Sequence, residues 1–177
     1  MLSGWGNLVF FDTEEHQATE RMGGKKIAQI PKLGSQWRII YDFKPTEYLQ
    51  ASTSRWGISL HTGDELTPGS SLIFTGFQLQ TIVVALCILN NQAQTKTVVE
   101  GTQLLKVGEW TRIEIGHEKV DEKYFLALSI GGREVGRKEV TDPELRKPTD
   151  VKIFIGHPVE KRCQPGFIRR LVVLEKR

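Results

Sequence analysis

Apolar and polar residues alternate along most of this chain, in short runs separated by Gly, Pro, Asn or Asp. In residues 36–44, for example, Trp37, Ile39, Tyr41 and Phe43 fall on one side of a strand and the residues between them on the other. About a dozen such runs predict an all-β protein built as a sandwich or barrel. The predicted strands cover residues 7–11, 25–30, 36–44, 56–61, 71–74, 81–90, 94–99, 110–115, 123–130, 134–139, 151–155 and 167–174.

Two successive runs in the second half of the chain predict antiparallel hairpins. Trp110, Arg112 and Glu114 alternate with Thr and Ile residues, and a second run of the same period ends at Gly131-Gly132. Polar connections and Gly-Gly turns are typical of antiparallel neighbours, because glycine readily adopts the positive φ that tight hairpin turns require.

The pattern of apolar residues predicts neither a long helix nor a membrane span. Residues 14–21 and 141–145 are the only stretches that suggest a short helical turn, and neither has an apolar stripe. The longest apolar run, residues 82–89, is too short for a transmembrane helix, which needs about 20 residues. We interpret it as a strand buried on both faces and expect no membrane span.

The apolar faces of the predicted strands indicate which side chains form the core. Large side chains on these faces remove enough apolar surface from water for the domain to be stable without a metal ion or a disulfide. The predicted core consists of Trp37, Ile39, Tyr41, Phe43, Trp56, Val84, Leu86, Trp110, Ile113, Leu126, Leu128, Phe154, Ile155, Phe167, Leu171 and Val173.

Composition and length fit one soluble domain covering residues 1–177, with 39% hydrophobic and 25% charged residues. The net charge of +3 is too small to indicate nucleic-acid binding. No signal peptide is visible at residues 1–6, which leaves an intracellular protein or a fragment of a longer one as alternatives. Cys87 falls in the most apolar strand and Cys163 in a polar loop, so a disulfide between them is disfavoured.

Three segments resemble the concanavalin A-like lectin and glucanase superfamily, and within it the laminin-G-like and pentraxin-like modules. They are the Trp-led strand Gly108–Ile115, the hairpin from Leu126 through Gly131-Gly132 to Glu139, and the final pair of strands, residues 152–156 and 166–173. The resemblance implies a jelly-roll β-sandwich of two antiparallel sheets. It also implies a module that recognises glycans or an extracellular protein partner.

Catalytic residues are not indicated. Glycan hydrolases of this superfamily carry a Glu-x-Asp-x-x-Glu strand, and the nearest match here, Glu114, Gly116 and Glu118, lacks the central Asp. We interpret these acids as a solvated strand end. The sequence also has no Gly-x-Ser-x-Gly elbow, and its four histidines are not paired locally with a nucleophile. We therefore expect no enzyme activity.

Metal ligands are weakly indicated. Asp64 and Asn90 are the candidates, because a hard cation needs several clustered oxygen ligands. A turn at Gly63-Asp64 explains the first more simply. We expect no cofactor, although the resemblance leaves calcium open.

Two groups of residues are candidates for ligand binding. Arg55 and His61 lie on a predicted strand opposite Trp56, Ile58 and Leu60, so their side chains are expected to form a surface with Ser59. The second group is a basic cluster near the end of the chain. It comprises Lys161, Arg162, Arg169, Arg170, Lys176 and Arg177, with Arg146 and Lys147 as further candidates, and the first four are the candidate ligand-binding residues.

An ordinary solvated face explains the basic cluster more simply, but a site for an acidic glycan or another anionic partner is the best-motivated binding hypothesis. Because side chains alternate along a strand, only one of Arg169 and Arg170 is expected to face solvent unless the strand lies at an edge. The predicted function is a non-enzymatic, extracellular recognition module acting through loops or a sheet face. The alternative is a structural adhesion domain whose homotypic contacts produce a homo-oligomer.

Overall fold

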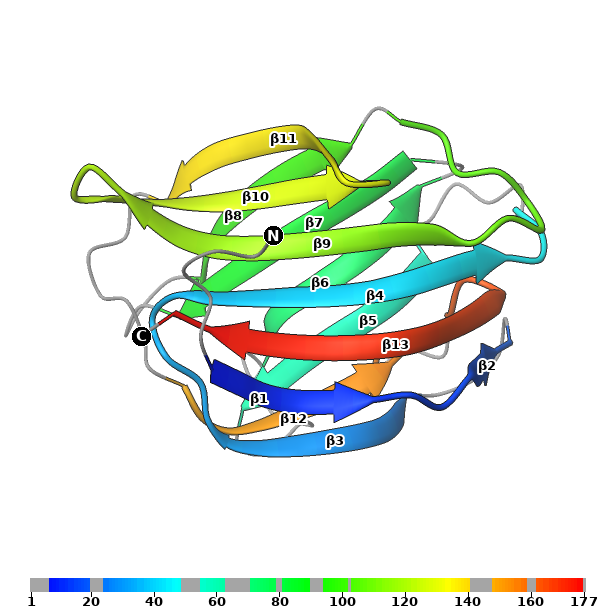
Figure 1. Cartoon of the computed structure of the whole chain (residues 1–177), viewed down its shortest axis with the longest axis horizontal. Helices are drawn as coiled ribbons and strands as arrows, with labels where there is room; N and C mark the ends of the chain where they lie inside the picture. The colour runs from blue at the N-terminus through cyan, green and yellow to red at the C-terminus, as the bar shows by residue number, and fades with distance from the viewer. Residues whose placement is uncertain are drawn as a thin grey trace.

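Two antiparallel sheets pack face to face in the computed structural model, which describes residues 7–19, 24–48, 55–62, 71–78, 81–89, 94–101, 103–140, 148–158 and 162–176 (Figure 1). We call the sheet nearer the viewer in Figure 1 the front sheet and the other the back sheet. The all-β sandwich predicted from the alternating pattern is confirmed.

The front sheet brings together the two ends of the chain. Its strand order places β13 between β1 and β4, so the last strand of the chain is an inner strand next to the edge strand β1. The short strand β2 also pairs with β13. In spatial order the strands are β1 (Asn7–Asp12), β13 (Gly166–Glu175), β4 (Trp37–Pro45), β9 (Thr111–Val120), β10 (Lys123–Ile130) and β11 (Arg133–Val140), with β2 (His16–Ala18) beside β13.

The back sheet follows the same plan, with the late strand β12 inserted between two early ones. At the other side of the sandwich, β8 lies against β10 and β11 of the front sheet. The strands of the back sheet in spatial order are β3 (Lys25–Lys32), β12 (Thr149–Ile155), β5 (Arg55–Thr62), β6 (Ser71–Gln78), β7 (Thr81–Leu89) and β8 (Gln94–Gly101).

All twelve predicted strands occur, most within two or three residues of their expected bounds. The helical turn suggested for residues 14–21 is wrong for its described part, because His16–Ala18 forms β2. Pairing with β13 satisfies the backbone there, which a lone turn without an apolar stripe could not do. The turn suggested for residues 141–145 lies outside the described residues.

The core lies between the sheets, where the inner faces of the strands meet. Tyr41, Phe43, Ile113 and Leu128 are fully buried. Of the other predicted core residues whose burial is described, Trp37, Ile39, Leu126, Ile155, Leu171 and Val173 join them.

Three predicted core residues, Trp56, Trp110 and Phe167, are instead only half-buried. Phe154 is buried but on the outer face of the back sheet, against His61. The side chains of Val84 and Leu86 lie outside the part of the chain that is described.

Both predicted hairpins are confirmed, with two-residue turns at their tips. Asp121 and Glu122 have φ values of 48° and 66°, and Gly131 and Gly132 have 60° and 80°. Positive φ at both central residues is typical of turns whose twist matches that of the flanking strands. Within the described residues there is no helix long and apolar enough to cross a membrane.

Candidate functional site

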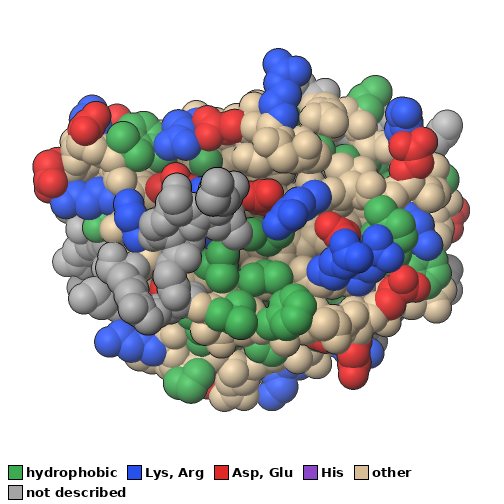
Figure 2. All heavy atoms as spheres, in the orientation of Figure 1, with side chains coloured by type: hydrophobic (Ala, Val, Ile, Leu, Met, Phe, Trp, Pro, Cys, Tyr) green, Lys and Arg blue, Asp and Glu red, His purple; other side chains and the backbone are tan. Residues whose placement is uncertain are grey.

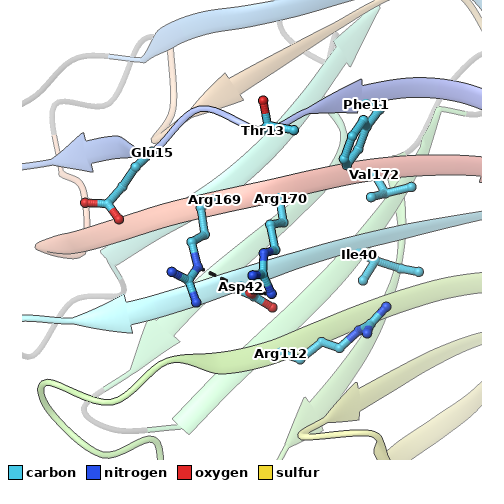
Figure 3. A pocket seen from close by; sticks show the side chains of 9 residues that line it. All are labelled: Phe11, Thr13, Glu15, Ile40, Asp42, Arg112, Arg169, Arg170 and Val172. Atoms are coloured by element: carbon cyan, nitrogen blue, oxygen red, sulfur yellow. Dashed lines mark hydrogen bonds and ion pairs between the residues drawn. The ribbon is translucent and has the colours of Figure 1, made fainter.

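The outer face of the front sheet carries a half-open groove of about 500 Å3 (Figure 3). One wall is charged, with Asp42, Arg112, Arg169 and Arg170 from three adjacent strands. The other wall is apolar. It consists of Phe11, Ile40 and Val172, with Thr13 and Glu15 completing the lining. Figure 2 shows the same surface, with Lys and Arg side chains beside hydrophobic ones over the middle of the sheet.

A β-bulge in β13 places two successive arginines on this face. Arg169 pairs with Asp42 and Val172 with Ile40, so β13 has one more residue than β4 over this interval. The extra residue, Arg170, has a φ of 53°. Arg169 and Arg170 therefore both point outward, which corrects the expectation that only one of them faces solvent.

The two arginines share one acceptor. Arg169 Nε lies 3.4 Å and Arg170 Nη1 lies 3.5 Å from Oδ2 of Asp42. The Asp42 side chain is only 15% exposed, whereas that of Arg170 is 66% exposed. Most of the Arg170 side chain is therefore accessible to a ligand.

Aromatic rings fix the neighbouring cations. The guanidinium carbon of Arg169 lies 3.9 Å from the ring centre of Trp110. Lys44 Nζ lies 4.7 Å from the ring centres of both Trp110 and Phe167. Cation–π contacts of this kind explain why Trp110 and Phe167 sit at the surface instead of in the predicted core.

Further ion pairs lie on this face. Arg38 Nη2 lies 2.6 Å from Glu118 and Arg38 Nη1 lies 3.8 Å from Glu114. Arg112 Nε is 3.1 Å from Glu114. Glu114 and Glu118 thus lie within β9 and in ion pairs, which overturns the interpretation of a solvated strand end. The strand is longer than predicted because Gly116–Val120 pairs with β10.

A further ion pair lies near the edge of the front sheet. Arg137 Nη2 is 2.7 Å from Glu134. The hydrogen bond from Arg137 lowers the pKa of the Glu134 carboxyl.

The first group of candidate ligand-binding residues lies on the back sheet and is largely covered. His61 and Ser59 are fully buried, with His61 Nε2 3.1 Å from Ser59 Oγ and the serine hydroxyl donating to the carbonyl of Gly156. His157 contacts the His61 ring. The expectation of an exposed surface is therefore wrong for Ser59 and His61, while Arg55 is half-buried at the start of β5.

The basic cluster is not one surface. Arg162 is exposed, but its carbonyl accepts a hydrogen bond from Trp56 N of the back sheet, so it lies away from the arginine pair of β13. Lys161, Asp64 and Asn90 lie outside the described residues. Among the candidate ligand-binding residues that the structure describes, Arg169 and Arg170 alone are brought together.

Cys163 is a free thiol, in agreement with the disfavoured disulfide, and it is buried although the surrounding segment is polar. Its Sγ lies 3.2 Å from the carbonyl oxygen of Trp56, and burial raises the thiol pKa to about 12. Such a thiol is a poor nucleophile and a poor metal ligand.

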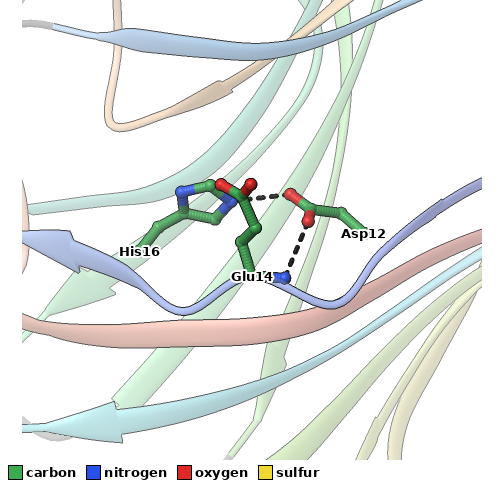
Figure 4. Close-up of side chains that lie close together, drawn as sticks. All are labelled: Asp12, Glu14 and His16. Carbon is green, nitrogen blue, oxygen red and sulfur yellow. Dashed lines mark hydrogen bonds and ion pairs between the residues drawn. The ribbon is translucent and has the colours of Figure 1, made fainter.

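One cluster could hold a cation by geometry. Asp12, Glu14 and His16 offer ligand atoms within 4.8 Å of one another (Figure 4). Burial raises the pKa of Asp12, but hydrogen bonds from His16 and from Glu14 N outweigh it and leave this pKa below its ordinary value. The internal bonds already engage Asp12 and His16, so the cluster by itself is a structural turn.

Sequence reasoning missed Phe11, Asp42 and Arg112 as groove residues. The alternation in their strands did place Asp42 and Arg112 on polar faces. The missing information was strand order, because only the fold shows that β13 lies between β1 and β4.

Comparison with solved structures confirms the concanavalin A-like jelly-roll fold. A heptameric SAP-like pentraxin from Limulus polyphemus aligns over 92% of this chain and 74% of its own, with a TM-score of 0.63 and 14% identity. An endo-β-1,4-glucuronan lyase from Trichoderma reesei aligns over 98% of this chain and 92% of its own, with a TM-score of 0.62 and 10% identity. Mouse laminin α1 domains LG4-5 align over 93% of this chain and 42% of their own, with a TM-score of 0.60 and 13% identity.

No family profile and no curated protein sequence matches the chain. The similarity is therefore one of fold, at identities too low to carry over a ligand or an activity.

Proposed function

We propose that this chain, a concanavalin A-like jelly roll, is a non-enzymatic recognition module that binds an acidic glycan in the groove of the front sheet. The observation that carries the proposal is the pair Arg169 and Arg170, which converge on one carboxylate beside an apolar wall. Guanidinium groups bind carboxylate and sulfate oxygens through paired hydrogen bonds. An apolar wall offers a surface to the C–H face of a sugar ring.

The groove chemistry favours binding over catalysis. Its described lining contains no His, Tyr, Cys or Lys that could move a proton, and its acids are Asp42 and Glu15. Asp42 already accepts hydrogen bonds from two arginines, Arg169 and Arg170. Since one similar fold belongs to a glucuronan lyase, the direct test is incubation with polyuronates. We expect no unsaturated product, and its appearance would overturn the non-enzymatic part of the proposal.

The comparisons support the choice of ligand only by analogy. One similar protein acts on glucuronan, an acidic polysaccharide, and another is a laminin domain pair. By the same analogy, we place this module outside the cell. No metal enters the proposed contacts, so we expect binding to be equal in calcium and in a chelator.

The proposal is tested on an array of neutral and acidic glycans, with and without calcium. We expect acidic glycans to be bound, and Arg169→Ala to abolish that binding. Arg137→Ala is a matched control on the same face, and Arg162→Ala is a control beside the back sheet. A blank array, or equal loss with all three variants, would contradict the proposal.

Self-association is a second candidate, favoured by the edge of the front sheet. Among the described strands, β1 has a front-sheet neighbour on one side only, and Leu8 on it is 61% exposed. Edge strands of this kind can pair between copies. Light scattering over a range of protein concentrations tests it. A rise in mass that Leu8→Lys removes would favour this candidate, whereas a constant mass would exclude it.

A further inference from the structure

We infer that the groove binds a sugar bearing a single carboxylate, and that the bulge residue Arg170 determines this specificity. The inference rests on the proposed function and deepens it. It concerns which acidic glycan is bound and which residue selects it.

The bulge inserts one arginine into an otherwise regular strand. Arg169 faces outward, Leu171 is buried, Val172 lines the groove and Val173 is buried. Without Arg170, these four residues would alternate without interruption between the two faces. The structural effect of the extra residue is therefore to add a second guanidinium to the groove.

Arg170 also holds an unfavourable backbone conformation. Its φ of 53° lies in the left-handed region, which residues with a Cβ rarely adopt and glycine adopts readily. The surrounding pairs of β13 with β1 and β4 hold it there. Strain of this kind gathers at functional sites, so the combination of strain with an exposed charge in a groove points to a binding role.

The charge balance of the face limits the ligand to about one anionic group. Arg38, Arg112 and Arg137 contact glutamates of the same sheet. At the groove, Arg169, Arg170 and the adjacent Lys44 face two acids, Asp42 and Glu15, which leaves one positive charge in excess. A densely sulfated chain needs a row of unmatched cations, whereas a sugar with one carboxylate needs a single one.

The apolar wall positions the sugar ring. Phe11 is 53% exposed beside Val172, its partner in the pairing of β1 with β13. A pyranose lying against Phe11 and Val172 would direct its carboxylate toward Arg170. The ligand class is therefore a uronate residue, bound by its ring and by its carboxylate together.

The test measures binding of an oligogalacturonate, its methyl ester and a dextran sulfate oligosaccharide of equal length, which bears sulfates and no carboxylate. We expect the free acid to bind at least tenfold more tightly than the ester and than the sulfated fragment. Arg170→Gly should remove the preference for the acid, and its unfolding midpoint should be equal or higher because glycine relieves the strain. Deletion of Arg170 should also remove this preference, while Arg137→Ala should keep it.

The outcomes separate this inference from the proposed function. If the dextran sulfate fragment binds more tightly than the uronate and Arg169→Ala abolishes its binding, the uronate class is wrong and the acidic-glycan groove stands. If Arg170→Gly folds and still prefers the acid to the ester, Arg170 is not the selecting residue. If no acidic oligosaccharide binds the wild-type protein, both proposals fail.

Discussion

The guanidinium of Arg169 lies over the indole of Trp110, with 3.9 Å between the guanidinium carbon and the ring centre. The two residues belong to opposite sides of β4, since Arg169 is on β13 and Trp110 immediately precedes β9. The contact holds Arg169 in place before any ligand arrives, which reduces the entropy lost on binding.

Replacing Trp110 by Ala should therefore weaken binding of the acidic glycan. A cation–π contact at a half-buried site contributes about 1 kcal/mol, which corresponds to about a fivefold rise in Kd. Titration calorimetry measures the change. Trp110→Phe keeps an aromatic face and should recover part of the affinity, whereas equal affinities for all three proteins would show that Trp110 does not position Arg169.

The substitution Asp42→Asn should lower the stability of the protein and raise its affinity for the acidic glycan. The carboxylate reduces the repulsion between Arg169 and Arg170, so its loss should lower the free energy of unfolding by about 1 kcal/mol or less. The same loss removes a competitor for the arginines and should tighten binding of the acidic glycan. Thermal unfolding with and without the ligand measures both effects, and weaker binding by the variant would contradict the assignment of Asp42 as that competitor.

His117 should make stability depend on pH. Its ring stacks between Trp37 and Tyr124, Nδ1 donates to the carbonyl of Ser35, and Nε2 is buried without a hydrogen-bond partner. Burial lowers the pKa of His117 below its ordinary value of 6.5, although the bond to Ser35 opposes this. As the pH falls through 6.5, the unfolded chain binds a proton that the folded protein does not, so stability falls.

Urea unfolding between about pH 5 and 8 tests this dependence. His117→Phe keeps a ring between its neighbours and cannot titrate, so its stability should fall less than that of the wild type over the same range. The Asp12 carboxyl, with a pKa below 3.8, does not contribute there. Parallel profiles for the two proteins would show that His117 is not the titrating group.

Cys163 should resist alkylation in the folded protein. Its thiol is buried and its pKa is raised to about 12, so very little thiolate is present near neutral pH. Brief treatment with iodoacetamide, followed by peptide mass spectrometry, should find Cys163 unmodified in native protein and modified in urea. Rapid native labelling would show that the segment of Cys163 opens readily.

The alternation of apolar and polar residues predicts the strands of this protein. Residues whose burial differs from that pattern do so because of contacts with strands distant in the sequence. Trp110 and Phe167 occupy positions that a pattern assigns to the core, but Lys44 and Arg169 provide cationic partners for their rings at the surface. No local feature of the sequence identifies those partners. His61 was expected at a surface because it alternates with Leu60, yet the outer face of β5 is covered there.

The sequence also does not predict which residues come together in the groove. The arginine pair was a candidate from its charge, but its geometry depends on a bulge that the sequence does not mark. Phe11 could not be joined to it at all, since strand order decides which residues far apart in the chain become neighbours. Alternation with a period of two shows which residues of one strand lie on the same face of the sheet. It carries no information on which strands are neighbours in that sheet.

The position of β13 has a kinetic consequence. The contact between Arg169 and Asp42 joins residues 127 positions apart, and β13 must enter between β1 and β4 to form it. Contacts of such long sequence separation form slowly, because much of the chain loses its freedom before they stabilise anything. A folding molecule therefore has no groove until β13 docks between β1 and β4, and the capacity to bind a ligand reports completion of the sheet.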